Sequence, residues 1–334
     1  MTLHALRPRG ATLRILAART VALGLLAATT SAIAQEWPTR PVRFIAPFPP
    51  GGSVDQVARV LANYLAPGLG QQVVVDNRGG AAGSIGTAQA AKAAPDGYTF
   101  VVVFDTHGVN PSLIPNMPFD TQKDLAPVML VGQSAMAVTV HSSSPINSFG
   151  ELVAAAKAKP ESIGYGTIGA GSLGHLAMVL LQGQGAFRMT HVPYKGGGPL
   201  MQDAVAGHVP VAIGTTFLVS PHVQSRSIRP IAVTSAKRAP QFPDVPTLAE
   251  QGFRTFEAYA WWGVLAPAAT LPAIVNRMNA ELVKALAIPA ARERLAQQGM
   301  DIVASSPEAF GRFVAGEIER WGKVVRDNGI KAGE

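Results

Sequence analysis

Short runs of β-branched and aromatic residues alternate with helical patterns along most of this chain, and this alternation constrains the fold more than any other feature. Three such runs come first, at Val42–Ala46, Gln72–Asp76 and Thr99–Phe104, with helical patterns between them. The same order restarts over residues 162–213. Continuous apolar runs between helices indicate parallel strands that are covered on both faces. The sequence therefore predicts an α/β protein made of two α/β blocks.

Two long extended stretches flank the second block. Pro127–Val140 precedes it, Phe253–Pro267 follows it, and only helical patterns come after the later stretch. We therefore expect two α/β lobes joined by two crossing strands, with a ligand cleft where the carboxyl ends of the strands face each other. The predicted lobe 1 comprises residues 35–132 and 256–334, and the predicted lobe 2 comprises residues 133–255.

The first 34 residues have the parts of a secretory signal peptide. Four arginines precede the apolar run Val21–Ala28, small residues follow it, and no acidic residue occurs before Glu36. This order predicts export to the periplasm with cleavage after Ala34. Removal of the four arginines leaves 24 Lys and Arg against 21 Asp and Glu, so the net charge falls from +7 to +3.

Composition excludes several functional classes. The mature chain holds no cluster of basic residues and no aromatic residues interleaved with them, which argues against nucleic-acid binding. It has no cysteine for a disulfide or a lipid anchor. Its histidines are scattered without metal-ligand spacing. We therefore predict a soluble monomer without a metal or cofactor.

Glycine-rich loops follow four of the predicted strands, and each leads into a predicted helix. They are residues 47–53, 79–84, 166–172 and 194–199. Glycine lets a ligand approach the backbone closely, and the free N–H groups and the dipole at a helix start favour negative charge. Glycine and serine are also common in ordinary strand-to-helix turns. Four such loops in corresponding places on two lobes nevertheless predict a shared anion site between the lobes.

Local capping patterns indicate where two helices begin. Ser53 and Gln56 have the spacing of a capping box, which predicts a helix immediately after Gly52. Ser306-Pro307 predicts the start of the last helix, with serine as the cap and proline at the first helical position.

Two enzymatic interpretations involve the loop before residue 174. Gly169–Gly174 matches G-x-G-x-x-G, but no acidic residue occurs between Ser172 and Asp203, where a dinucleotide site needs one. Ala170–Gly174 differs by one residue from the nucleophile elbow of hydrolases, and Asp203 and His208 follow it. Ser172 is equally explained as a helix cap. A secreted serine hydrolase with Ser172 as its nucleophile therefore stays open as an alternative.

Several longer motifs resemble one known family. The stretch Trp37–Asp55 contains Pro-Phe-Pro-Pro-Gly-Gly-Ser-Val-Asp, and further matches lie at Val75–Gly86, Pro95–Thr99, Val192–Gly196, Pro243–Gly252 and Trp262–Pro267. Together these motifs resemble the Bug family, the TctC-like solute-binding proteins of tripartite tricarboxylate transporters. The resemblance covers essentially the whole mature chain.

The resemblance implies a type II periplasmic-binding-protein fold that closes on a small organic carboxylate, catalyses no reaction and delivers its ligand to integral-membrane permease subunits. A sensory subunit for a membrane kinase is the alternative. By position, the lobe 1 contacts to the ligand would be Phe48, Gly51, Gly52, Ser53, Asp55, Ser84, Thr106 and His107. The lobe 2 contacts would be Gly169, Gly171, Ser172, His175, Tyr194 and Lys195.

One departure from the family pattern bears on the ligand. Pro210 and Gly214 stand in a region where members of the family usually carry aspartate. Fewer acidic groups near the cleft reduce the repulsion of an anion, and Phe217 adds apolar surface. We therefore predict a monocarboxylate or an aromatic carboxylate rather than an amino acid.

Overall fold

The computed structural model describes residues 37–297 and 299–331, and the described residues from Arg40 onward form one compact unit. The predicted signal peptide lies outside the described residues. The strands are β1 (Val42–Ala46), β2 (Val73–Asn77), β3 (Thr99–Phe104), β4 (Leu125–His141), β5 (Gly164–Thr167), β6 (Thr190–Pro193), β7 (Val211–Thr215), β8 (Ile228–Val233), β9 (Tyr259–Pro267) and β10 (Asp301–Ile302).

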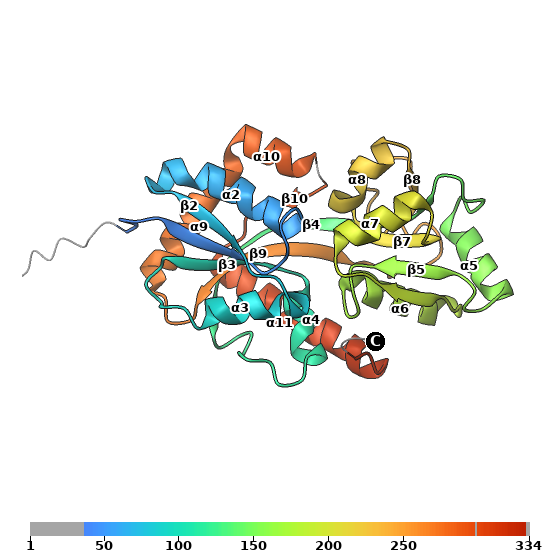
Figure 1. Ribbon diagram of the computed structural model, residues 1–334, viewed down its shortest axis with the longest axis horizontal. Coiled ribbons are helices and arrows are strands. Elements are labelled where there is room, and N and C mark those ends of the chain that lie inside the picture. The colour runs from blue at the N-terminus through green and yellow to red at the C-terminus, as the bar shows by residue number, and fades with distance from the viewer. Residues whose placement is uncertain (1–36, 298, 332–334) are drawn as a thin grey trace, which may run out of the picture. The chain divides into compact units, whose positions relative to one another are not determined.

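These strands form one path in the order β2-β1-β3-β9-β4-β7-β5-β6, with β8 and β10 paired to β4 (Figure 1). Strands β2, β1 and β3 are parallel, and so are β6, β5 and β7. Strand β9 runs antiparallel to β3 and β4. Two parallel groups joined through antiparallel strands confirm the predicted two-lobed α/β fold.

Strand β4 passes through both groups because its partners change along its length. Residues 125–135 of β4 pair with β9, and residues 136–141 pair with β7 and β8. In Figure 1 the elements coloured blue, teal and orange gather on one side of β4, and the green-to-yellow elements gather on the other. We call these groups lobe 1 and lobe 2. The predicted boundary between residues 132 and 133 falls inside β4. This boundary and the second one, between residues 255 and 256, remain proposals.

Three details of the predicted strands were wrong. Residues 253–258 are not a strand, so the second crossing segment becomes β9 only at Tyr259. Strand β8 was not predicted. Strand β10 follows β9, although only helices were expected there; its two residues pair with Gln133 and Gly132 of β4. A strand of two residues is too short to show a period, so only its distant partner identifies it.

Helices pack on the sheet in both lobes. They are α2 (Ser53–Leu69), α3 (Ser84–Ala91), α4 (Thr106–Leu113), α5 (Phe149–Ala158), α6 (Leu173–Gly185), α7 (Gly197–Ala206), α8 (Thr216–Gln224), α9 (Pro272–Ala287), α10 (Pro289–Ala296) and α11 (Pro307–Asp327), with a 3₁₀ turn η1 (Ala81–Gly83) before α3. Helices α4, α5 and α8 were not predicted. Pro111 inside α4 and Pro221 inside α8 hide the helical pattern, because proline usually interrupts a helix.

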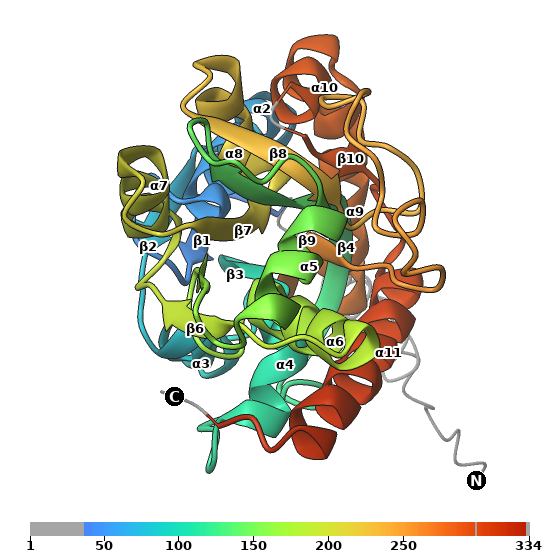
Figure 2. The ribbon, with the colours of Figure 1, turned by 90° about the vertical axis from the view of Figure 1, so that its right-hand side faces the viewer.

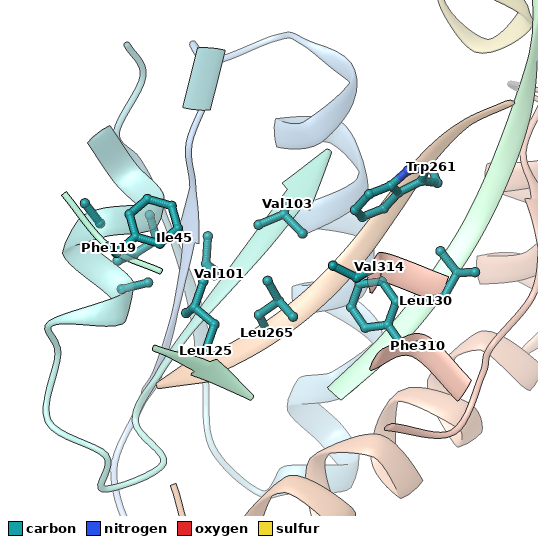
Figure 3. Packing of buried hydrophobic residues seen from close by; sticks show 12 residues of the cluster. Ile45, Val101, Val103, Phe119, Leu125, Leu130, Trp261, Leu265, Phe310 and Val314 are labelled. Carbon is teal, nitrogen blue, oxygen red and sulfur yellow. The ribbon is translucent and has the colours of Figure 1, made fainter. Parts of the chain in front are cut away.

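The lobe 1 core lies between the sheet and helix α11. Trp261 of β9 contacts Phe310 of α11 edge-on, with ring centroids 5.8 Å apart, and Val103 and Val314 pack in the same cluster (Figure 3). Figure 2 shows α11 running alongside α4 and α6. Ser306 caps α11 as predicted, since its Oγ accepts the Ala309 N–H at 3.2 Å. Ile45 of β1 and Val103 of β3 also belong to this cluster, each next to the last residue of its strand, and the cavity described next begins at these strand ends.

Among the helices of the described residues, none combines the length and the apolar character that a bilayer span requires.

Candidate functional site

A cavity of about 710 Å³ lies between lobe 1 and lobe 2. Ligand pockets are typically about 300–1,000 Å³. Lobe 1 contributes the loop between β1 and α2 and the end of β3, and lobe 2 contributes the starts of α6, α7 and α8. The lining consists of residues 48–54, Gln56, Phe104, Asp105, Met136, Ile168, Leu173, Gly174, residues 195–199, Met201, Gln202, Val205, Gly214, Thr215, Phe217, Leu218, Pro221 and His222.

The loop between β1 and α2 is held in place from behind. Asp55 is buried; its carboxylate accepts the Gly51 N–H at 2.9 Å and pairs with Arg59 at 3.0 Å. Asn77 of β2 donates its side-chain amide to the Phe48 carbonyl at 3.1 Å. Burial raises the pKa of Asp55, but hydrogen bonds from Arg59, Gly51 and Asn77 outweigh it and leave the pKa below its usual value. Asp55 is therefore an ionised support for the loop.

Helix α2 starts where the sequence predicts, but the capping box is wrong. Gly52 is the N-cap, and Ser53 is already the first helical residue. Gln56 donates its side-chain amide to the Gly51 carbonyl at 2.9 Å instead of closing a capping box with Ser53. Within the described residues, no hydrogen bond occupies the Ser53 hydroxyl. Because glycine ends the loop, this serine is available to a ligand.

Helices α2 and α7 begin at the cavity with glycine at the N-cap, Gly52 and Gly196, and neither start has a side-chain cap. In α2, the Gln56 amide is the first to make the regular hydrogen bond to the carbonyl four residues earlier. The backbone amides of residues 53–55 therefore have no such partner within the helix. In α7, the Leu200 amide is the first to make this hydrogen bond, so the backbone amides of residues 197 and 198 have no such partner within the helix. Unpaired amides at a helix start favour an anion. The two starts come from different lobes and line one cavity.

Helices α6 and α8 begin differently, because each is capped by its own hydroxyl. Ser172 accepts the His175 N–H at 3.4 Å and donates its hydroxyl to the Gly169 carbonyl at 2.7 Å. Thr215 accepts the Leu218 N–H at 3.1 Å. Of the predicted loop residues Gly169, Gly171, Ser172 and His175, none lines the cavity, although the neighbouring Ile168, Leu173 and Gly174 do.

A pair of imidazoles supports the start of α6. The rings of His175 and His191 stack with centroids 3.9 Å apart, and His175 Nδ1 accepts the Gly171 N–H at 3.0 Å. Burial lowers the pKa of His175 to about 4, and burial together with the neighbouring His175 lowers the pKa of His191 to about 4. Both rings are therefore neutral at pH 7. The predicted contact His175 acts on the loop backbone in this structure.

The loop before α7 places one cation at the cavity. Lys195 lines the cavity and is exposed, and no ion pair among the described residues involves it. Tyr194, the preceding predicted contact, donates its hydroxyl to Asp203 at 2.7 Å and does not line the cavity. Burial and then Asp203 raise the pKa of Tyr194 to about 12.

The remaining predicted lobe 1 contacts lie outside the lining. Ser84 and Thr106 are the buried first residues of α3 and α4. His107 stacks on Phe119 with centroids 6.4 Å apart, and burial lowers the pKa of His107 to about 3. The loop before α3 packs behind the cavity loop, since a Cβ at Gly83 would meet the Phe48 ring at 3.1 Å. Five of the predicted contacts line the cavity: Phe48, Gly51, Gly52, Ser53 and Lys195.

Sequence reasoning missed the contribution of α8 and of Asp105. Helix α8 was not predicted because Pro221 interrupts its helical pattern. The lining residues at its start and along it were therefore missed as a helix: Thr215, Phe217, Leu218 and His222. A threonine between a strand and the following residues could have indicated a helix start there. Asp105 lies between β3 and α4 and is 2% exposed. Burial and then repulsion from Glu317 raise the pKa of Asp105 well above its usual value. The described residues hold no group of three or more His, Asp or Glu side chains arranged for a metal ion.

Comparison with known proteins gives consistent similarities. The model of the tripartite tricarboxylate transporter family receptor matches residues 57–330. Protein BugT of Bordetella pertussis is 39% identical over 300 residues, which cover 89% of this chain and 92% of BugT.

Solved structures are similar over the same span. The periplasmic binding protein BugD has a TM-score of 0.82 and 33% identity, with coverage of 89% of this chain and 100% of BugD. An R. palustris protein solved with adipate has a TM-score of 0.84 and 34% identity, with coverage of 89% and 100%.

Proposed function

Since the chain belongs to the tripartite tricarboxylate transporter receptor family, the Bug or TctC-like periplasmic solute-binding proteins, we propose that it captures a small organic carboxylate in the periplasm and delivers it to integral-membrane permease subunits. Members of this family are binding proteins and not enzymes. The R. palustris relative solved with adipate supports the carboxylate class.

One observation carries the proposal: two helices from different lobes begin at one cavity with glycine N-caps and unpaired amides. A carboxylate between them would accept hydrogen bonds from both lobes. Ser53 would add a hydroxyl and Lys195 a positive charge. Such a ligand bridges the lobes, and this is the contact that a two-lobed receptor needs in order to close.

The hydrogen bonds that this site offers to a carboxylate are enough to account for a micromolar affinity. A hydrogen bond to a charged group contributes about 1.5–3 kcal/mol. Four or five such donors, offset by desolvation and by the loss of translational freedom, can reach the roughly 8 kcal/mol of a micromolar complex. Direct contacts are proposed from Phe48, Gly51, Gly52, Ser53 and Lys195. The other predicted contacts stay a prediction.

The hydrolase alternative has less support than the receptor. The Ser172 hydroxyl donates to the Gly169 carbonyl, and His175 Nδ1 accepts a backbone amide. Asp203 accepts the Tyr194 hydroxyl and contacts His208. None of these bonds joins Ser172 to a general base.

A thermal-shift screen tests the proposal. Cells expressing the full chain are subjected to osmotic shock, and the protein purified from that fraction is measured with di-, tri-, amino-acid and aromatic carboxylates, followed by calorimetry. A ligand that binds only the native state stabilises it by about 2.7 kcal/mol at a hundredfold excess over Kd. Stabilisation by a carboxylate that Ser53→Ala weakens supports the site. Absence of the protein from the shock fluid, or no response to any carboxylate, would overturn the proposal.

A second measurement concerns the partner. Uptake of the radiolabelled ligand into cells carrying the permease subunits should require this protein. If the ligand binds but uptake is unaffected, the sensory alternative replaces the transport role.

A further inference from the structure

The charges around the cavity are few. Among the described residues that line it, Lys195 is the only lysine or arginine and Asp105 is the only acid. The Asp105 side chain is 2% exposed, and no described side chain bonds to its carboxyl oxygens. Gln202 and His222 add hydrogen-bonding groups, but neither carries the fixed charge of a lysine or arginine. The cavity therefore offers one exposed cation, Lys195, and one buried carboxyl group, Asp105, whose pKa is raised well above its usual value by burial and by repulsion from Glu317.

This charge pattern discriminates between classes of carboxylate. The ammonium group of an amino acid would have no exposed carboxylate to pair with, because Asp105 is buried and its raised pKa favours the neutral carboxyl form. A second carboxylate would have no second cation. Burying an unpaired ion is costly, so both groups disfavour binding. The pattern selects a ligand with one carboxylate and an uncharged body.

Aromatic rings form a continuous wall across the two lobes. The Phe48 ring meets the Phe104 ring at 6.0 Å, the Phe104 ring meets Trp262 at 5.1 Å, and Trp262 meets Phe217 at 5.7 Å. Phe48 and Phe104 belong to lobe 1, Trp262 to β9 and Phe217 to α8 of lobe 2. Phe48, Phe104 and Phe217 line the cavity, and the fully buried Trp262 joins the Phe104 ring to the Phe217 ring.

Aliphatic side chains complete the apolar surface. Met136 comes from β4, Leu173 from α6 and Leu218 from α8, and all of them line the cavity. Aromatic pairs contribute about 0.5–1.5 kcal/mol beyond the area that they bury. A ring placed against Phe104 and Phe217 would therefore gain both burial and ring contacts from opposite lobes.

We propose that the ligand of this site is a monocarboxylate with an aromatic ring, whose carboxylate lies at the glycine-capped starts of α2 and α7 and whose ring packs against Phe104 and Phe217. The inference rests on the proposed function and specifies the ligand class of that same site. It also predicts that the ligand differs in class from the adipate of the R. palustris relative.

Calorimetry with three matched probes tests this inference: 3-phenylpropanoate, 3-cyclohexylpropanoate and adipate. We expect 3-phenylpropanoate to bind at least tenfold more tightly than adipate, with the cyclohexyl compound between them. If adipate or glutamate binds most tightly, this inference is wrong while the carboxylate receptor stands. If none of the acids in the wider screen binds, the proposed function itself fails.

Two variants test the position of the ring. Phe217→Leu keeps an apolar side chain and should weaken 3-phenylpropanoate at least threefold while changing 3-cyclohexylpropanoate less. The matched control is Phe242→Leu, since Phe242 is equally buried in the lobe 2 core but does not line the cavity. Phe242→Leu should leave both affinities unchanged. Equal losses for both ligands in Phe217→Leu, with native circular dichroism, would overturn the ring contact.

Discussion

The starts of α2 and α6 look alike in sequence, since a glycine-containing loop leads into each helix through a serine. In α2 the N-cap is Gly52, and the Ser53 hydroxyl has no partner within the described residues. In α6 the N-cap is Ser172, and its hydroxyl makes two hydrogen bonds. A shift of one residue in the cap position leaves one serine free for a ligand and uses the other to hold its own helix.

The two loops also differ in what supports them. The loop before α2 is held by an ionised carboxylate, Asp55, which pairs with Arg59. The loop before α6 is held by hydroxyl groups and by the neutral imidazole of His175. We therefore expect changes around α2 to affect ligand affinity most, and changes around α6 to affect stability and its pH dependence most.

Acid should cause the largest loss of stability, through the His175–His191 pair. The pKa of each falls from about 6.5 to about 4 on folding, so the unfolded chain binds more protons between these values. The stability of the folded state is therefore complete above pH 6.5, falls as the pH drops toward 4 and then levels off. The loss is on the order of 2–3 kcal/mol for the buried His175 and smaller for the half-buried His191, where solvent screens the charge. Urea unfolding at pH 7.0, 5.5 and 4.5 measures it.

Carboxyl groups elsewhere in the chain also bind protons as the pH falls. The contribution of the histidine pair is therefore isolated by comparing the pH dependence of the wild type with that of two variants. His191→Phe should reduce the dependence on pH, because it removes one titrating ring and leaves a ring to stack on His175. His208→Gln should change the dependence less, because His208 is exposed and its one side-chain partner among the described residues is Asp203. Equal pH dependence in all three proteins would contradict the role of the pair.

Asp55→Ala should have the next largest effect, on ligand affinity. Without the carboxylate the Gly51 amide loses its acceptor and Arg59 loses its ion-pair partner, so the loop before α2 is held less firmly, although Asn77 still bonds to the Phe48 carbonyl. We expect the tightest carboxylate of the screen to bind at least tenfold more weakly by calorimetry. Asp96→Ala is the control, because it breaks the exposed ion pair with Arg40 and should leave the affinity unchanged. An unchanged affinity in Asp55→Ala would show that the loop does not need this support.

Ser172→Ala should lower the free energy of unfolding by about 1 kcal/mol, the usual cost of losing a serine N-cap. Ser306→Ala removes the same kind of cap from α11, outside the cavity lining, and should cost a similar amount. Chemical denaturation measures both, and ligand affinity should change less than threefold in either variant. If Ser172→Ala loses the ligand without losing stability, Ser172 is a direct contact and the contrast with Ser53 disappears.

Ser53→Ala should have the smallest effect on stability, less than about 0.5 kcal/mol, because no hydrogen bond within the protein is lost. Its effect should appear in calorimetry as a three- to tenfold weaker affinity for the carboxylate. A stability loss as large as that of Ser172→Ala would mean that Ser53 supports the helix after all.

Local patterns were enough to predict several, but not all, of the elements that position the site. The strand Thr99–Phe104 and the start of α11 at Ser306-Pro307 were correct because neighbouring residues encode burial and capping. Helix α8 was missed because Pro221 resembles a break in the pattern. The predicted contact Ser84 lies at a helix start, as expected, whereas Thr106 begins α4, a helix that was not predicted. Both residues lie outside the present lining.

By itself the sequence determined two α/β lobes, the crossing strand β4 and glycine-rich loops at the strand ends, since each depends on residues close together in the chain. Only the tertiary structure decided which loops line the cavity and which hydroxyl groups are free. Asn77 holds Phe48 from 29 positions away, and Trp262 joins Phe104 to Phe217 across both lobes. Such partners are set by how distant segments pack, and no local period or turn pattern specifies them.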